Sequence, residues 1–168
     1  FKKILIYPLF CIIIFTGAIY PIFGTLNRVD DRFKETNLTL DGSKFLNNTI
    51  YNGPNGKIDL THDYDAIKWI KKNITNVPVI IEGNGPLYSW SSRYSIYTGM
   101  PSVIGWDWHQ VQQRGYNRLI INERINDVDE FYSTEKLERK IQLVNKYNID
   151  LIITGELEKN KYPNNGLK

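Results

Sequence analysis

The stretch VPVIIEG, residues 77–83, is a short and continuous apolar run that ends in a carboxylate and a glycine. A run of this kind is typical of a β-strand that is buried on both faces, as the strands of a parallel sheet are. Two later runs, PSVIGW (101–106) and IDLIITGE (149–156), have the same character. We therefore predict three short strands in a small, mainly parallel sheet.

Segments with helical periodicity alternate with these strands. Residues 64–74 predict a helix with Asp63 as its N-cap, and residues 134–147 predict another that Thr134 caps. The expected buried stripe of the first is Ile67, Trp69, Ile70 and Ile74, and that of the second is Leu137, Ile141, Val144 and Tyr147. This alternation predicts the α/β class. We expect a three-layer α/β domain over residues 63–168, after an irregular lead-in over residues 25–62 with one short strand or helical turn.

The N-terminus carries an uncharged, apolar run, ILIYPLFCIIIFTGAIYPIFG, over residues 4–24. As a helix it spans roughly 30 Å, the thickness of the hydrocarbon core of a bilayer. The apolar region of a signal peptide is shorter, about 7–15 residues, and ends in a small-residue cleavage site that this run lacks. We predict a transmembrane helix over residues 1–24. Because the chain begins with Phe1, we expect it to be the last span of a longer protein.

Charge gives the expected orientation and excludes one class of partner. Lys2 and Lys3 place the N-terminal end in the cytoplasm by the positive-inside rule, although three basic residues soon after the span oppose this. The protein is therefore expected in the cell membrane, with residues 25–168 on the outer face. Without those two lysines, 19 basic residues stand against 18 acidic ones, so a nucleic-acid partner is not expected.

The three predicted strands end in similar polar sequences. Residues 82–85 are EGNG, residues 105–107 are GWD, and residues 154–156 are TGE. Ligands of open α/β sheets bind beyond the carboxyl ends of the strands. We therefore expect these three segments to lie at one face of the domain.

The densest polar and aromatic segment is GWDWHQVQQRG, residues 105–115. It predicts a two-turn helix that Asp107 caps and Gly115 ends. Arginines bind planar oxyanions such as phosphates, and aromatic rings stack on sugars. The residues expected to bind a substrate are Arg93, Trp106, His109, Gln112 and Arg114.

Acid–base chemistry is the weaker interpretation of this region. Glu82, Asp107 and His109 are candidate catalytic residues, and the alternative is a structural hydrogen-bonded network. A zinc site is not expected, because His62 is the other histidine and Cys11, the single cysteine, lies in the apolar run. Three N-x-T sequons make Asn37, Asn47 and Asn73 glycosylation candidates.

Several segments together resemble a known membrane protein family. They are TLDG (39–42), DYDAIKWIKKN (63–73), PVIIEGNGPLYSWSSRYSIYTGMPSVIGWDWHQVQQRG (78–115), INDVDEFYST (125–134) and YNIDLIITGELEKNKYPNNGLK (147–168). They are similar to the C-terminal part of the large archaeal and chloroflexal multi-spanning membrane proteins with the YYY domain. That family is grouped with the GT-C glycosyltransferases, which use lipid-linked sugars.

The resemblance implies a function for the whole protein and a supporting role for this region. The expected reaction moves a sugar from a lipid-phosphate donor to an acceptor glycan or protein, and the expected partners include membrane lipid. The catalytic acid of GT-C enzymes lies in the first outer loop, which this chain lacks, so residues 25–168 are expected to help bind substrate. No cofactor is expected here, and a divalent metal belongs to the remainder of the protein. The alternatives are a small membrane-anchored hydrolase and a non-catalytic structural or partner-docking ectodomain.

Overall fold

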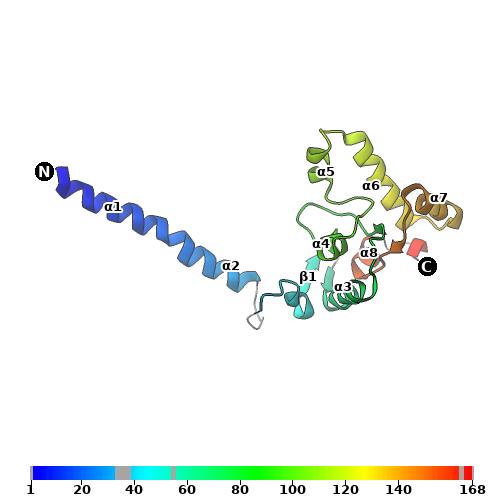
Figure 1. The fold of residues 1–168 in the computed structure, drawn as a ribbon, viewed down its shortest axis with the longest axis horizontal. Coiled ribbons are helices and arrows are strands. Elements are labelled where there is room, and N and C mark those ends of the chain that lie inside the picture. Colours follow the sequence, from blue (N-terminus) through cyan, green and yellow to red (C-terminus); the bar gives the residue numbers. More distant parts are fainter. Residues whose placement is uncertain (1, 33–38, 54–55, 163–164, 168) are drawn as a thin grey trace. The chain divides into compact units, whose positions relative to one another are not determined.

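The computed structural model describes residues 2–32, 39–53, 56–162 and 165–167. The chain divides into two compact units, Phe1–Phe45 and Leu46–Lys168. Figure 1 shows a long helix in the first unit and a mixture of short strands and helices in the second.

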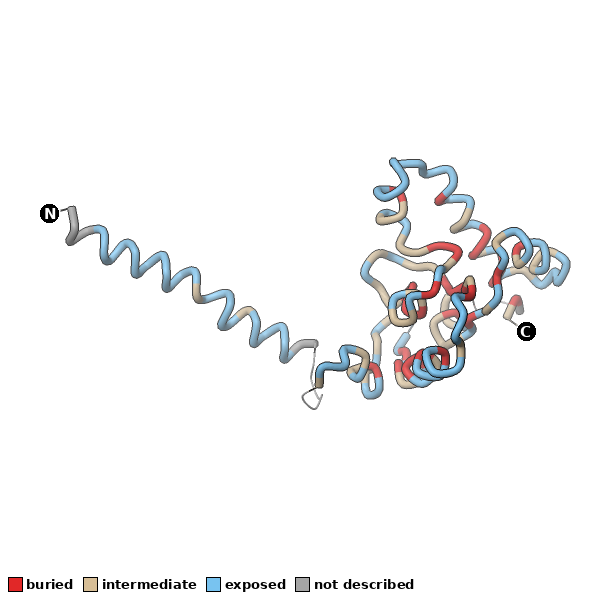
Figure 2. Tube along the Cα trace, in the orientation of Figure 1, coloured by how far each residue is buried: buried red, intermediate tan, exposed pale blue. Residues whose placement is uncertain are grey.

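The first unit is dominated by one helical run. Helix α1 (Lys2–Ile19) continues through a π-helical turn, η1 (Tyr20–Gly24), into α2 (Thr25–Arg32). Pro21 lies in the π turn, where its missing N–H favours a local departure from α-helical hydrogen bonding. The stretch Ile6–Asp30 is long and apolar enough to cross a membrane, and Figure 2 shows it exposed along almost its whole length. The prediction of an N-terminal helix that can span a membrane is thus confirmed, although the helix continues beyond Gly24.

The second unit contains two of the three predicted parallel strands in a shortened form, whereas the predicted strand at 101–106 is wrong and contributes a single bridge. Strand β3 (Ile80–Ile81) pairs in parallel with β4 (Leu151–Ile152), and Ile80 also forms a parallel bridge with Ser102. The Ile80 N–H donates to the Pro101 carbonyl at 2.9 Å, and the Ile153 N–H donates to the Ile81 carbonyl at 2.9 Å. The segment 77–83 therefore lies between the two other predicted strands, as a central parallel strand should. The mixed α/β class is confirmed in this coarse form, and the three-layer arrangement stays a prediction.

The predicted lead-in contains more regular structure than expected. Besides α2, it holds a 3₁₀ turn, η2 (Lys44–Asn48), and an antiparallel hairpin of β1 (Ile50–Gly53) and β2 (Gly56–Asp59). Gly56 has φ +135°, a conformation that glycine adopts without strain. Leu46 and Ile58 are buried, so this part of the lead-in belongs to the core of the second unit.

Helices surround the parallel segments. In chain order they are α3 (Thr61–Asn73), α4 (Arg93–Thr98), α5 (Asp107–Gln113), α6 (Arg118–Ser133), α7 (Leu137–Tyr147), α8 (Glu156–Lys161) and the 3₁₀ turn η3 (Asn165–Leu167). The main apolar cluster joins Ile81 of β3 to Val111 of α5, Ile121 of α6 and Leu143 of α7. The sheet, α5, α6 and α7 therefore share one core.

Helix α3 departs from its predicted start and stripe. It begins at Thr61, whose N–H is bonded to the Asp59 carboxylate at 2.9 Å, so Asp63 is not the N-cap. Asp63 lies inside the first turn and is buried. Ile67 and Ile70 are buried as predicted, but Trp69 is 59% exposed. The prediction was wrong for Trp69 because the opposite side of the helix meets the core.

Helix α7 begins later than predicted and buries a different side chain. Thr134 follows the end of α6, and Lys136 is the residue that precedes the first turn of α7. Leu143 is 1% exposed, whereas Leu137 and Ile141 are exposed. The predicted stripe was wrong for these two residues, and α7 meets the core along Leu143, Val144 and Tyr147.

Candidate functional site

Glu82 follows β3 directly and is 1% exposed. Its carboxylate accepts hydrogen bonds from the backbone N–H groups of Tyr94 and Ser95, each at 3.0 Å, in the first turn of α4. Unpaired backbone donors at a helix start are natural partners for a buried carboxylate. Burial nevertheless raises the pKa of Glu82, and these hydrogen bonds and the charge of Arg93 offset only part of the effect.

Arg93, the first residue of α4, is the centre of a buried ion network. Its guanidinium makes a bidentate pair with Glu158 of α8, at 3.0 and 2.8 Å, and its Nε donates to Asp63 of α3 at 2.8 Å. Arg93 and Glu158 are 1% and 0% exposed, so the pair is shielded from water. Bidentate pairing of this kind fixes the orientation of both side chains.

The same carboxylates have further donors. Glu158 accepts the backbone N–H groups of Gly83 and Gly155 at 3.0 and 2.9 Å, and therefore connects the ends of two strands. Asp63 accepts the Trp90 indole N–H at 2.8 Å and the Tyr94 hydroxyl at 2.9 Å. The network thus joins α3, α4, α8 and the ends of β3 and β4.

The pKa values in this network follow from burial and pairing. Burial alone would raise the pKa of Glu158, but its hydrogen bonds with Arg93 and the charge of Arg93 bring it below its ordinary value. Burial alone would lower the pKa of Arg93, but Glu158 and Asp63 raise it above its ordinary value. Both groups are therefore charged at neutral pH, and each stabilises the charged form of the other.

Beside this network lies an open pocket of about 250 Å³, which we call the hairpin pocket. It lies where the β1–β2 hairpin, the segment after β3 and α8 come together. Its lining includes Tyr51, Gly53, Asn84, Ser89, Ser91 and Lys161. An aromatic ring, two amides, two hydroxyls and one cation line it, together with glycine backbone and the apolar side chains of Ile58, Pro86 and Leu157.

A second pocket of about 290 Å³, the strand-end pocket, adjoins the first. Asn84, Gly85, Pro86 and Lys161 line both pockets. Its other lining residues are Gly105, Asp107 and Ile125. The segments after two of the parallel strands therefore meet at one edge, as expected for an open α/β sheet.

Lys161 is held in place between the two pockets. Its ammonium group donates to the Asn84 side-chain oxygen at 2.5 Å, to the Asn84 backbone carbonyl at 2.9 Å and to Asp129 at 2.9 Å, so its three N–H donors all have acceptors. Asp129 also accepts the Tyr162 hydroxyl. The Lys161 side chain is one-third exposed, so it presents a positioned positive charge to a ligand while it remains paired.

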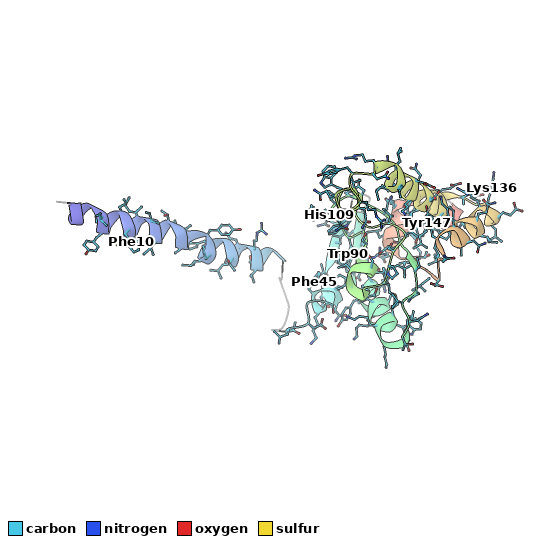
Figure 3. All side chains as sticks on the ribbon, turned by 45° about the horizontal axis from the view of Figure 1, so that its top comes forward. Phe10, Phe45, Trp90, His109, Lys136 and Tyr147 are labelled. Atoms are coloured by element: carbon cyan, nitrogen blue, oxygen red, sulfur yellow. The ribbon has the colours of Figure 1, made fainter. Side chains whose placement is uncertain are left out.

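The predicted binding residues separate into groups. Arg93 lies in the buried network, whereas Trp106 and His109 pack with Tyr88, with ring centroids 5.2 to 5.5 Å apart. The His109 Nε2 is hydrogen-bonded to the Tyr88 hydroxyl at 3.1 Å. Figure 3 labels His109 and Trp90, and the Trp90 indole N–H donates to the same carboxylate as Arg93.

The other candidates are more exposed. Gln112 faces solvent, and the Arg114 Nε donates to Gln110 at 3.2 Å within the same helix. Asp107 accepts the N–H of Trp108, lies in the first turn of α5, and lines the strand-end pocket.

Trp106 is the N-cap of α5, so the prediction that Asp107 caps this helix was wrong. The predicted end is confirmed, because α5 ends at Gln113 and Gly115 adopts φ +64° after the C-cap residue Arg114.

The candidate catalytic residues have separate hydrogen-bond partners. Within the described residues, no hydrogen bond joins Glu82, Asp107 and His109. Their use in a hydrolase stays a prediction. No group of three or more His, Cys, Asp or Glu side chains suited to a metal occurs in the part of the chain that the structure describes.

Sequence reasoning missed Glu158, Tyr51 and Lys161. A signal existed for Glu158, since it stands three residues after Gly155, the spacing of a carboxylate that binds the N-cap N–H of a helix. For Tyr51, the turn residues at 52–56 favoured a hairpin beside the sheet. Nothing in the local sequence distinguishes Lys161 from Lys159, the other lysine of α8.

Of the sequon residues, Asn47 and Asn73 are exposed, and the Asn73 amide donates to the Trp69 carbonyl. Asn37 lies outside the described residues.

The chain matches no family model, and no curated protein or solved structure shows significant similarity to it. The function is therefore argued from the geometry of the site.

Proposed function

We propose that this chain is a membrane-anchored domain that binds the sugar of a lipid-phosphate-linked donor in the hairpin pocket. The observation that carries the proposal is the lining of that pocket, which combines the Tyr51 ring with Asn84, Ser89 and Lys161. Sugars bind proteins through stacking on aromatic faces and through hydrogen bonds with amides and hydroxyls. Ligand pockets are commonly about 300–1,000 Å³, so about 250 Å³ suits a small ligand such as one sugar ring.

The phosphate of the lipid-linked donor is assigned to Lys161. This ammonium group lines both pockets, and a phosphate in the strand-end pocket would be within its reach. Lysine binds phosphate as a point charge. The site differs from the one expected from the sequence, because Arg93 lines neither pocket, whereas Tyr51 lines the hairpin pocket and Lys161 lines both.

The apolar helical run and the resemblance to GT-C-like membrane proteins both favour this function. The helical run Ile6–Asp30 is long and apolar enough to cross a bilayer, where lipid-linked donors reside. We propose that residues 25–168 lie on the outer face, and that the whole protein is a GT-C-like glycosyltransferase whose catalytic residues lie elsewhere. The acceptor is a glycan or a protein.

The experiment uses the full chain in lipid nanodiscs and three probes. They are a polyprenyl-phosphate-linked monosaccharide, the same polyprenyl phosphate without sugar, and the free monosaccharide. Tyr51→Ala removes the stacking ring, and Tyr51→Phe is the matched control that keeps the ring. We expect Tyr51→Ala to weaken binding of the sugar-bearing probe about tenfold, or roughly 1.4 kcal/mol, and Tyr51→Phe to bind like the original protein.

The sugar-free probe and the variants separate the outcomes. If polyprenyl phosphate binds as tightly as the sugar-bearing probe, the sugar contributes nothing and the proposal is wrong. Unchanged binding by Tyr51→Ala would place the ligand outside the hairpin pocket.

A further inference from the structure

The junction of α5 and α6 is an exposed apolar corner. Residues 112–120 are all exposed, and we call residues 108–120 the α5–α6 corner. Its exposed apolar side chains are Trp108 (38%), Tyr116 (68%), Leu119 (83%) and Ile120 (44%). Figure 2 shows this corner as exposed on both helices where they meet. These four large apolar side chains lie close together in the sequence and are exposed to water, which is unusual for a surface without a binding partner.

The corner has a fixed structure. Val111 and Ile121, on either side of the junction, are 2% and 0% exposed and belong to the main core. The Tyr116 N–H donates to the Val111 carbonyl at 2.8 Å and closes the end of α5. The exposed side chains are therefore held outward by helices whose other faces are buried.

Within the corner, aromatic and basic groups are arranged together. The rings of Trp108 and Tyr116 lie 6.4 Å apart, and the Arg118 guanidinium lies 5.1 Å from the centre of the Trp108 ring. Tyr116 has φ +62°, a left-handed conformation that costs a bulky residue about 1–2 kcal/mol. This backbone conformation of Tyr116 places its exposed ring beside Trp108.

The charge of the corner has one sign. Arg114 and Arg118 lie within it, and no acidic residue occurs in the sequence between Asp107 and Glu123. Trp and Tyr are enriched where proteins meet lipid headgroups, and basic residues are attracted to anionic lipids. Exposed leucine and isoleucine beside such residues are typical of surfaces that enter the interfacial layer.

We propose that the α5–α6 corner inserts into the headgroup layer of the membrane that holds α1. The lipid surface is favoured over a protein partner because the corner combines aliphatic, aromatic and basic side chains, and because the same chain carries a helix that can cross a bilayer. Trp108, Tyr116 and Leu119 enter the interface, and Arg114 and Arg118 contact lipid phosphates. This contact does not require a ligand in the hairpin pocket.

The test measures the depth of nitroxide labels on the full chain in nanodiscs that contain anionic lipid. The single cysteine, Cys11, lies exposed in α1, so a label on the unchanged protein reports whether α1 is in the bilayer. In a Cys11→Ser background, Leu119→Cys labels the corner. Leu137→Cys is the matched control, an exposed leucine in the first turn of α7.

We expect the label at position 119 to have a several-fold higher ratio of oxygen to nickel-chelate accessibility than the label at position 137. In discs of purely zwitterionic lipid, or with Arg114→Gln and Arg118→Gln together, that ratio should fall toward the control. Equal ratios at the two positions would show that the corner stays in water and would overturn the proposal. Loss of access to both reagents at position 119 would show a protein cover and would also overturn it.

The label at Cys11 separates this proposal from the binding function. If Cys11 is in lipid and position 119 is in water, the corner proposal fails while sugar binding remains open to its own test. If Cys11 is in water as well, the membrane anchor fails and the corner proposal fails with it.

Discussion

At the scale of the residue, the Arg93 guanidinium is placed where it neutralises two buried carboxylates. Replacing Arg93 by Ala leaves Glu158 and Asp63 without their counter-charge in a site that water does not reach. We expect a loss of about 3–5 kcal/mol in the free energy of unfolding. Chemical denaturation of the full chain, followed by circular dichroism of the second unit, measures this loss.

Arg139→Ala is the control for that change. Arg139 also makes a bidentate pair, with Glu130 at 2.9 and 2.8 Å, but the pair is exposed to solvent. Exposed pairs contribute little to stability, so we expect a much smaller loss. Similar losses in both variants would contradict the assignment of a special role to the buried network.

The two buried glutamates predict opposite pH effects. The folded-state pKa of Glu158 is below its ordinary value of 4.5, so its contribution to stability is present above pH 4.5 and is lost as the pH falls through the folded-state value. The folded-state pKa of Glu82 is above 4.5, so its contribution is present below pH 4.5 and is lost as the pH rises through the folded-state value.

Unfolding free energies measured at a series of pH values test these signs. Below pH 4.5, Glu158→Gln should lose less stability on acidification than the original protein. Above pH 4.5, Glu82→Gln should lose less stability as the pH rises. If both variants follow the pH dependence of the original protein, neither carboxyl has the environment described above.

The sequence indicated that the Glu82 carboxylate requires partners but did not indicate which groups they are. A carboxylate at the end of a buried strand requires hydrogen-bond or ionic partners, and a nearby arginine is the usual one. The structure instead gives Glu82 the first N–H groups of α4 and gives Arg93 to Glu158. This pairing depends on the packing of α8 against the strand ends. Glu158 of α8 is 65 residues from Arg93 in the sequence, so no local signal predicts the pair.

At the scale of the element, Tyr132 joins α6 to the parallel strands. Its buried hydroxyl lies 3.0 Å from the Ile81 carbonyl and 2.7 Å from the Ile153 carbonyl. We expect Tyr132→Phe to lower the free energy of unfolding by roughly 1–2 kcal/mol, because a buried carbonyl loses its donor. The denaturant midpoint should shift while the slope of the transition stays the same.

Tyr116→Phe is the control for this substitution, because Tyr116 is exposed. An equal shift in the two variants would show that the Tyr132 hydroxyl does not hold the strands to α6.

Strands β3 and β4 were predictable from sequence, because short apolar runs bounded by Gly and polar residues are typical of buried strands. The positions of the helices were predictable, but the side of each helix that meets the core was not. Leu137 fits a buried stripe by periodicity, yet α7 meets the core along the neighbouring row of Leu143 and Val144. Trp69 lies on the side of α3 opposite the buried Ile67 and Ile70. Periodicity gives the width of a stripe, whereas tertiary packing selects its centre.

At the scale of the whole molecule, the proposed orientation predicts glycosylation in a eukaryotic microsomal system. Asn47 and Asn73 are exposed sequon residues that follow the apolar helix. If they lie on the outer face, they enter the microsomal lumen, and the protein should migrate as glycosylated species. Replacing all three sequon asparagines by Gln should abolish the shift.

A sequon added before Lys2 serves as the control and should remain unmodified. Modification at that added site, with none after the helix, would reverse the orientation.

The hairpin pocket is the feature of the whole molecule that sequence could not supply. Tyr51, Asn84 and Lys161 come from the hairpin, the end of β3 and α8, and only the folded chain brings them together. The strand ends themselves were predictable, since two of the three polar segments line the adjoining pocket. The arginine and histidine candidates were not brought to it, because chemical type alone does not show which side chains the fold has already paired.

The most direct test of the account is to locate the bound donor on the full chain. A polyprenyl-phosphate-linked sugar with a photoreactive group on the sugar is cross-linked in nanodiscs, and the modified residues are identified by mass spectrometry. The account predicts adducts on residues that line the hairpin pocket, such as Tyr51, Asn84 and Ser89, and competition by the unlabelled donor. Adducts confined to α1, or adducts elsewhere that the donor does not displace, would contradict it.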